Sequence, residues 1–428
     1  MGDRSIRAVP PPIRQSDVDA CPGALRLHAA ADGPLARVRL PGGMLTGSQL
    51  AVLGELAGQW GDGCLELTSR ANVQLRALRS ADPVELAARL AAAGLLPSPT
   101  HEVVRNIAAP PLAGAPTRAL VRELDRALCA DPGLAALPGR FLFAIGDVPS
   151  AADVAAVPAG EAFAILFAGD DQGVRVPAAD VVAALLAAAH AFLAERATHD
   201  PPPWRLRELP DGPARVAARA VVALSGPSAV SMPGAQPTTT HARGEDRGLV
   251  GLLAREDSLE TAVGALVPLG RLTRVHLGVL ARAERLVITP GRGVVVPDLA
   301  PEAADRWLRE LSEAGLATGG GSRWIGVTAC AGRPGCAKAL ADVRADAEAA
   351  TRFVDGLPVH WIGCARGCGS PAGAHVRVEA TPDGYVVSRV AGVALADVAL
   401  AGTPEPARDS GERDGERLGD VVAAARRS

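Results

Sequence analysis

The chain has no large excess of charge of either sign and almost no lysine. Its 428 residues carry a formal net charge of −3, and all but one of its 44 basic residues are arginine, the exception being Lys338. A general nucleic-acid-binding protein would show a large basic excess, so we expect no nucleic-acid partner. Arginine binds carboxylates through a planar fork that lysine lacks, although a compositional bias toward Ala, Gly and Arg accounts for most of the arginine count.

Long apolar segments are missing as well. Residues 1–19 are polar and contain no apolar core of a signal peptide. The longest uncharged apolar stretch, residues 181–194, is shorter than the roughly 20 residues that a helix needs to cross a bilayer. The seven cysteines are an odd number, which without an export signal fits reduced thiols better than a disulfide framework. We therefore expect a cytoplasmic protein with no membrane partner.

What the sequence does contain is an internal repeat. Residues 41–50 and 268–277 share the pattern P-x-G-x-L-T-x-x-x-L, and the match continues between residues 65–70 and 286–292. Each copy closes on a helical pattern that ends in Ala-Gly-Leu. The shared residues at fixed spacing, in the same flanking order, favour duplication over chance.

Each copy is expected to fold as strand, helix, strand, strand, helix. In the first copy residues 35–40 alternate as a strand, Thr46 or Ser48 can cap the following helix, and Asp82-Pro83 opens the last helix. Helices that return over a small sheet predict an α+β sandwich. Between the copies, residues 140–146 and 162–168 are expected as strands.

These patterns divide the chain into alternating repeats and larger units. We expect a mobile N-terminal tail at 1–20, repeat one at 21–100, a first catalytic-type unit at 101–200, a linker at 201–246, repeat two at 247–318, a cysteine-bearing catalytic unit at 319–402 and a mobile tail at 403–428.

Four cysteines stand in two short pairs, Cys330-x5-Cys336 and Cys364-x3-Cys368. Thiolates bind iron–sulfur clusters, zinc and copper(I), and the glycines around the second pair allow backbone N–H groups to wrap around sulfur. A helix expected at 337–349 would place its positive end at Cys336. The sequence therefore predicts a soft-metal centre.

An iron–sulfur cluster is the favoured interpretation of this centre, and zinc is the alternative. Structural zinc prefers tighter C-x2-4-C pairs than C-x5-C, and the compartment disfavours disulfides. The remaining cysteines are scattered singly, and we expect them to be ordinary core or surface thiols: Cys21, Cys64 and Cys129.

The cysteine pattern, with Ala-Cys-x-Gly at the first pair and Gly-Cys-x-x-x-Cys-Gly at the second, resembles the assimilatory sulfite and nitrite reductases. Residues 68–76, 104–114 and 137–141 resemble segments that line the tetrapyrrole pocket in that family, so the similarity covers roughly residues 21–380. It implies an α+β fold in which two ferredoxin-like small-domain repeats alternate with two nitrite/sulfite reductase-type α/β units. It also implies a [4Fe-4S] cluster on the four cysteines and a tetrapyrrole bound by Arg70, Arg76, Arg105, Asn106 and Arg140.

The sequence departs from the reductases where they carry a Lys-Phe-Lys segment. Here that segment is Arg140-Phe141-Leu142, which loses the second cation, although reduction of a small oxyanion needs several cations around it. The opening at residues 20–26 and the short first repeat resemble one branch of the superfamily, the precorrin-3B synthases. That resemblance implies O2-dependent oxidation of precorrin-3A at C20, with γ-lactone formation, in aerobic cobalamin biosynthesis.

The resemblance leaves the further cofactor open between a mononuclear iron and a siroheme, and no residue is assigned as catalytic. No G-x-G-x-x-G motif opens a credible strand–turn–helix unit, so NAD(P)H-derived electrons are expected to arrive through an external reductase or ferredoxin. Two other functions stay open: a siroheme-dependent sulfite or nitrite reductase, and a non-catalytic iron–sulfur electron-transfer protein.

Overall fold

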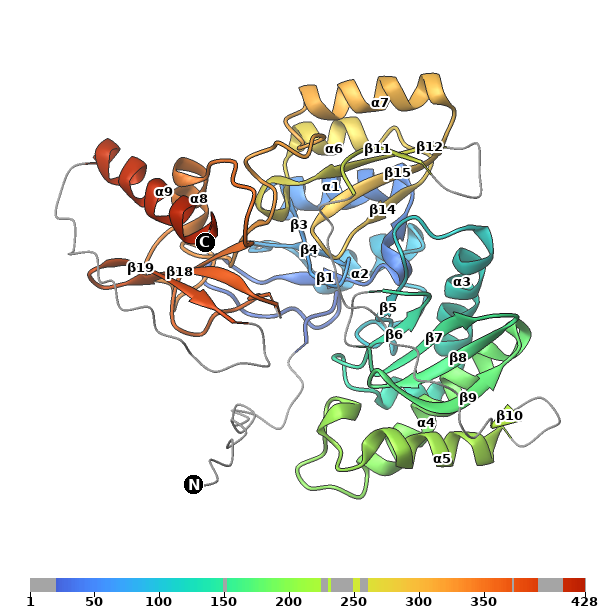
Figure 1. Ribbon diagram of the computed structural model, residues 1–428. Helices are drawn as coiled ribbons and strands as arrows, with labels where there is room; N and C mark the ends of the chain where they lie inside the picture. The colour runs from blue at the N-terminus through green and yellow to red at the C-terminus, as the bar shows by residue number, and fades with distance from the viewer. Residues whose placement is uncertain are drawn as a thin grey trace, which may run out of the picture.

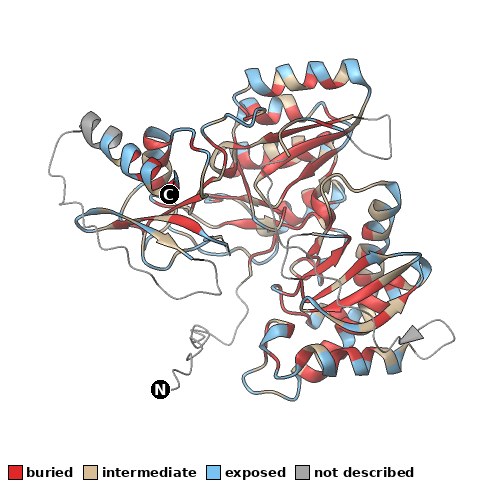
Figure 2. Cartoon of the chain, viewed as in Figure 1, coloured by how far each residue is buried: buried red, intermediate tan, exposed pale blue. Residues whose placement is uncertain are grey.

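The computed structural model describes residues 21–148, 152–224, 230–231, 249–254, 261–371, 373–391 and 411–427. The expected N-terminal tail at 1–20 lies outside the described residues. Figure 1 shows two repeats in contact at the centre, with one larger unit on either side of them. Buried residues gather in the sheets and on the inward faces of the helices (Figure 2).

Repeat one follows the expected order of elements, and its local chemistry explains why. Thr46 caps the first helix by accepting a hydrogen bond from the backbone N–H of Gln49 at 3.1 Å, and Asp82 caps the last helix, which has Pro83 in its first turn. The elements are β1 (Ala36–Val38), η1 (Pro41–Gly43), β2 (Met44–Leu45), α1 (Gly47–Trp60), β3 (Leu65–Leu67), β4 (Val73–Leu75) and α2 (Pro83–Ala92).

Repeat two has the same succession and adds a strand in front of it. Thr273 takes the N-cap position that Thr46 occupies in repeat one. The elements are β11 (Gly251–Ala254), β12 (Thr261–Leu266), η6 (Pro268–Gly270), β13 (Arg271–Leu272), α6 (Arg274–Leu280), β14 (Leu286–Ile288), β15 (Gly293–Leu299) and α7 (Pro301–Glu313).

The two repeats exchange strands. The sheet of repeat one has the order β1-β4-β3-β13, and the sheet of repeat two has the order β11-β12-β15-β14-β2, so the short strand after each Pro-x-Gly turn pairs with the other repeat. Gly43 lies at this crossing with φ 70°, and a Cβ there would stand 2.1 Å from the carbonyl oxygen of Ile288. One apolar core runs through both repeats, so neither repeat buries its apolar face alone.

The first larger unit is a mixed sheet with its helices on one face. The sheet order is β10-β9-β8-β7-β6-β5, and α3, α4 and α5 share one core with it. The expected strands appear as β6 and β8, whereas sequence reasoning missed β7 and β9, which pair with β8 on either side. The elements are β5 (Ile107–Ala108), α3 (Ala115–Ala130), β6 (Phe143–Ile145), β7 (Val154–Ala159), β8 (Ala162–Phe167), β9 (Asp170–Val176), α4 (Val181–Arg196), α5 (Gly212–Ala223) and β10 (Val230–Ser231).

Two segments of this unit bear on expectations from the sequence. Helix α5 lies inside the expected linker at 201–246 but packs in the core of the unit. Among the described residues, one helical segment, Ala178–Arg196, is long and apolar enough to cross a membrane. Its Leu185 and Phe192 are fully buried in that same core, which is how a core helix of a globular unit packs.

The cysteine-bearing unit is a small sheet with the order β16-β17-β18-β19. The first three strands are parallel and the last is antiparallel. Helices α8 and α9 contribute to one core with this sheet. The elements are β16 (Val327–Ala329), α8 (Val343–Ala350), β17 (Val359–Ile362), β18 (His375–Thr381), β19 (Gly384–Val390) and α9 (Gly411–Arg427).

The expectation of a mobile tail at 403–428 is wrong for residues 411–427, which form α9. Val422 and Ala423 are buried against the sheet. Arg426 is 2% exposed and donates hydrogen bonds to the backbone oxygens of Leu357 at 2.8 Å and Ile325 at 2.9 Å. The helix was not predicted because its apolar residues are few among many charged ones. The backbone oxygens that accept hydrogen bonds from Arg426 cannot be identified from the sequence.

Candidate functional site

The two cysteine pairs follow neighbouring parallel strands. Cys330 comes directly after β16, and Cys364 comes two residues after the end of β17. Because the carboxyl ends of parallel strands meet at one edge of a sheet, both loops leave the same edge. The backbone N–H of Gly363 donates to the Sγ atom of Cys330 at 3.2 Å, which is the type of contact that stabilises a thiolate.

The loop from Cys330 to Cys336 is held by backbone contacts rather than by a helix. The helix expected at 337–349 begins only at Val343, with Asp342 as its N-cap. Residues 337–342 are irregular, so the predicted helix-dipole effect on Cys336 does not apply. Cys336 instead donates its backbone N–H to the Gly332 oxygen at 2.8 Å.

The second loop, from Cys364 to Cys368, rests on a buried histidine. His360 is fully buried; its Nε2 lies 3.0 Å from the Cys368 carbonyl oxygen, and its Nδ1 lies 2.7 Å from Thr328 Oγ1. Burial lowers the pKa of His360 to about 4. The ring is therefore neutral near pH 7, and it supports the backbone of Cys368.

The four thiols share one region but do not form a closed ligand group. Burial raises the pKa of Cys368, the charge of Arg366 lowers it, and the charges of Cys330, Cys364 and Cys336 raise it again. All four are free thiols. Within the described ranges no group of three or more His, Cys, Asp or Glu side chains has the spacing of a metal site. Four reduced thiols on adjacent loops fit the donor chemistry of a [4Fe-4S] cluster. Because they do not form a closed ligand group among the described residues, their assignment as cluster ligands stays a prediction.

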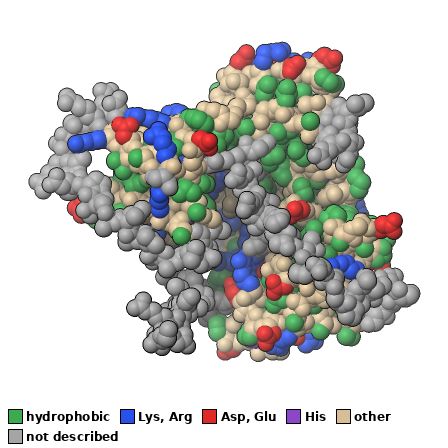
Figure 3. Space-filling model, viewed as in Figure 1, with side chains coloured by type: hydrophobic (Ala, Val, Ile, Leu, Met, Phe, Trp, Pro, Cys, Tyr) green, Lys and Arg blue, Asp and Glu red, His purple; other side chains and the backbone are tan. Residues whose placement is uncertain are grey.

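A cavity of about 240 Å³ lies beside Cys330 and Cys368. Glu66 is the only carboxylate among the described residues that line it, and its cationic lining consists of Arg37, Arg76, Arg292 and Arg344. Figure 3 shows a hollow between the cysteine-bearing unit on the left and the rest of the molecule, with blue Lys and Arg atoms visible in it. The cavity therefore combines sulfur with a strongly cationic wall, which suits an acidic ligand.

Arg70 and Arg76, both predicted to bind a tetrapyrrole, have different environments. Arg70 makes no ion pair with the described residues; burial, followed by the charge of Arg205, lowers its pKa to about 10. Arg76 lines the cavity but is already paired, because its Nε and Nη2 each lie 3.0 Å from the carboxylate of Asp32. Arg70 is the better candidate for a ligand, whereas Arg76 is committed to protein contacts.

Of the five residues predicted to bind a tetrapyrrole, Arg76 lines this cavity, and the other four, Arg70 included, do not. Arg105 pairs with Asp125 at 2.7 Å through both Nε and Nη2. Asn106 is buried and donates to two backbone oxygens, both at 3.0 Å. Arg140 is exposed and stacks over the ring of Trp204, with its guanidinium carbon 4.6 Å from the ring centroid. In this geometry Asn106 holds the backbone of the first larger unit. Arg105 also donates to the Leu95 oxygen at 3.2 Å, so it joins that unit to repeat one.

Sequence reasoning missed most of the charged wall. Arg37 donates to Gln74 Oε1 at 3.1 Å and 2.6 Å, and Arg292 has a buried Nη1 without a hydrogen-bond partner among the described residues. Arg344 and Glu66 form an ion pair. Arg37 stands just before the repeated Pro-x-Gly turn and Arg292 ends the repeated motif, so the repeat itself carried a usable signal for both.

Comparisons with known proteins agree with this architecture. Residues 28–93 match the model of the nitrite/sulfite reductase ferredoxin-like half domain. A precorrin-3B synthase from a Sinorhizobium species is 28% identical over 86% of this chain and 81% of that protein. The chloroplastic ferredoxin–nitrite reductase of Zea mays is 27% identical over 78% of this chain and 67% of that protein. The ferredoxin–nitrite reductase of Leptolyngbya laminosa is 27% identical over 81% and 76%.

A solved structure gives the same result for the fold. The NirA protein of Mycobacterium tuberculosis superposes with a TM-score of 0.65 and 20% identity, covering 83% of this chain and 73% of that chain. The predicted α+β fold class is confirmed, and the chain has the architecture of the nitrite/sulfite reductase superfamily. The resemblance to the precorrin-3B synthases, predicted from the opening residues and the short first repeat, is confirmed by the similarity to the Sinorhizobium protein.

Proposed function

We propose that this chain is an oxidoreductase that converts precorrin-3A to precorrin-3B with dioxygen, hydroxylating C20 and closing a γ-lactone. The observation that carries the proposal is the similarity to a precorrin-3B synthase over 86% of the chain. The cavity beside Cys330 and Cys368 supports it, because sulfur and four arginines meet there.

The cofactor we propose is a [4Fe-4S] cluster held by Cys330, Cys336, Cys364 and Cys368. Such a cluster supplies single electrons, and its potential depends on nearby charge and on hydrogen bonds to sulfur. The N–H of Gly363 already points at Cys330 Sγ. Two curated relatives are named as ferredoxin-dependent enzymes, which supports a ferredoxin or a similar reductase as the external electron donor.

The arginines give the proposed site its preference for an acidic ring. Precorrin-3A carries many carboxylates, and each charge-assisted hydrogen bond from a guanidinium contributes about 1.5–3 kcal/mol. A cavity of about 240 Å³ is smaller than a typical small-molecule pocket. It would therefore hold one edge of the ring, with Arg37 in its lining placed to bind a peripheral carboxylate, whereas Arg70 lies outside this lining.

A siroheme-dependent nitrite or sulfite reductase is the second candidate, and the matches to ferredoxin–nitrite reductases favour it. One observation in the chain speaks against it. The position of the second lysine in the reductase segment is Leu142, which is 5% exposed and packs in a small apolar cluster with Ala144 and Ala152. No cation can act on a small oxyanion from that position.

The deciding experiment supplies anaerobically reconstituted protein with precorrin-3A, a reductant and ¹⁸O₂. We expect a product that carries labelled oxygen, detected by mass spectrometry. The same preparation receives nitrite and sulfite in parallel. Ammonia or sulfide production together with an unlabelled tetrapyrrole would establish the reductase instead, and no turnover of any substrate by a cluster-loaded chain would leave only an electron carrier.

A further inference from the structure

We propose that Glu66 is a positioning residue for the metal centre. With Arg76 and Arg344 it forms a group, here called the loop clamp, that fixes both ends of the Cys330–Cys336 loop from repeat one and sets the charge beside the cluster. The proposal rests on the cluster assignment within the proposed function. It concerns one residue of β3, one residue just after β4 and one residue of α8, none of which is a predicted cluster ligand.

The first arm of the clamp reaches the Cys330 end of the loop. Arg344 stands in the first turn of α8, and its Nη1 lies 2.5 Å from Glu66 Oε1. Its Nε donates to the Cys330 carbonyl oxygen at 3.3 Å. One guanidinium thus joins the carboxylate of repeat one to the backbone of a predicted ligand, across 278 residues of sequence.

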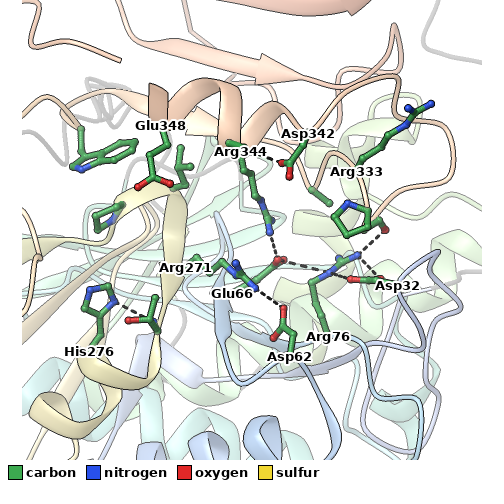
Figure 4. A pocket seen from close by; sticks show the side chains of 18 of the residues that line it. Asp32, Asp62, Glu66, Arg76, Arg271, His276, Arg333, Asp342, Arg344 and Glu348 are labelled. Carbon is green, nitrogen blue, oxygen red and sulfur yellow. Dashed lines mark hydrogen bonds and ion pairs between the residues drawn. The ribbon is translucent and has the colours of Figure 1, made fainter. Parts of the chain in front are cut away.

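The second arm reaches the other end of the loop. Arg76, just after β4, lies 3.7 Å from Glu66 Oε1 through its Nε, and its Nη2 donates to the Gly335 oxygen at 2.8 Å, next to Cys336. Burial alone would lower the pKa of Arg76, but the hydrogen bond to Asp32 and the charges of Glu66 and Asp32 raise it. In Figure 4 Arg344 and Arg76 come from different elements and converge on Glu66, with Asp32 beyond Arg76.

The place of the clamp explains why its charge matters. The side chain of Glu66 is 8% exposed, and that of Arg76 is 7% exposed. All three members line the cavity beside Cys330 and Cys368, and all three also line the neighbouring cavity of about 520 Å³ shown in Figure 4. The clamp therefore separates the two cavities. A partly desolvated carboxylate in this wall acts on a nearby redox centre more strongly than a surface charge does.

Two variants separate charge from position. Glu66→Gln keeps the shape and an acceptor oxygen but removes the negative charge, so the reduced cluster becomes easier to form. We expect the midpoint potential in an EPR-monitored redox titration to rise, with at least a tenfold change in the reduced-to-oxidised ratio at a fixed potential, equal to 59 mV for one electron. Arg344→Lys keeps the charge but loses the planar fork. We expect a near-normal potential and several-fold faster release of iron to a chelator.

Glu55→Gln is the matched control, because Glu55 lies in the same repeat, is 65% exposed and pairs with Arg89 at the surface. It should change neither readout. A cluster-loaded Glu66→Gln chain with an unchanged potential would overturn the electrostatic role, and unchanged iron release from Arg344→Lys would overturn the positioning role. A wild-type chain without iron and sulfide would reject the inference together with the cluster. Normal clamp results with no label in the product would reject the proposed reaction alone.

Discussion

The two repeats share one fold, but equivalent strand positions carry different side chains toward the cavities that they line. Glu66 and Val287 occupy the same place in the repeated motif, the second residue of the strands β3 and β14. Glu66 faces the cysteine loops through Arg344, whereas Val287 lines a cavity of about 350 Å³ on the side of α3. Duplication has therefore preserved the fold, while at this position of the motif repeat one carries a charge and repeat two does not. Repeat two contributes Arg292 to the cavity beside the sulfur atoms.

The register of the strands extends this comparison. Glu66 is opposite Gln74 in repeat one, and Val287 is opposite Val295 in repeat two. Two residues further along, the clamp residue Arg76 corresponds to Pro297, which cannot donate a hydrogen bond or pair with a carboxylate. The difference teaches that the cysteine-facing wall is specialised by side-chain chemistry and not by backbone shape.

The largest expected effect tests whether the chemistry lies on the cysteine side of the comparison. Cys364→Ser removes a predicted cluster ligand, so we expect complete loss of cluster and activity. Cys129→Ser, in α3 on the opposite side, should leave both intact. Iron and acid-labile sulfide are measured in anaerobically purified protein. Equal iron in wild type and Cys364→Ser would show that the ligand assignment is wrong.

The second prediction gives repeat one the residue that repeat two has at the equivalent position, Val287. Glu66→Val leaves Arg344 and Arg76 without their shared carboxylate in a partly buried place, and the loss of one partner of a buried pair costs about 3 kcal/mol or more. We expect the urea midpoint of unfolding to fall accordingly. Glu55→Val, at an exposed position, should change the unfolding free energy by less than about 0.5 kcal/mol. If both variants unfold alike, the clamp contributes nothing to stability.

The sequence predicted the scaffold better than the site. The repeat was visible because Pro-x-Gly turns and helix caps are local requirements, and Gly43 shows why the glycine is needed. The strand exchange between repeats was not visible, because it depends on contacts distant in sequence.

The site was predictable only where a local motif carries it. The spacing of the cysteines and the motif around Arg70 led to their assignments, which stay predictions. The clamp joins Glu66 to Arg344 across 278 residues, and no local pattern reports such a pairing. Arg105 was assigned to the pocket by resemblance, yet a carboxylate on α3 engages it. The sequence shows which charged residues are present, but it does not show which residues they pair with in the fold.

A third prediction compares an arginine on each side of the repeats. Arg70→Ala should weaken binding of the tetrapyrrole by about tenfold, because one charge-assisted hydrogen bond contributes about 1.5 kcal/mol or more. Arg122, an exposed residue of α3, lines the cavity beside Val287, and Arg122→Ala should not change the dissociation constant. Fluorescence titration of both variants measures the effect. Equal weakening by the two would indicate a diffuse electrostatic attraction instead of a defined contact.

The smallest expected effect concerns the helix caps of the two repeats. In repeat one the backbone N–H of Thr46 donates to Gln49 Oε1 at 3.0 Å, and in repeat two the N–H of Thr273 donates to Nδ1 of His276 at 3.1 Å. Burial lowers the pKa of His276 despite hydrogen bonds to Ala314 and Arg271 that raise it. A lowered histidine pKa gives stability that is present above the unfolded value, about 6.5, and is lost as pH falls through the folded value.

Acidification should therefore release the cap of α6 but not that of α1, at a cost of about 1 kcal/mol, the usual contribution of a helix cap. His276→Gln gives repeat two the acceptor that repeat one already has, and it should remove this part of the pH dependence of the thermal midpoint below about pH 6.5. Gln49→His is the reverse exchange and should add a similar dependence to repeat one. If the exchanges leave both pH profiles unchanged, the caps do not distinguish the repeats, and their difference is confined to the walls that face the cysteines.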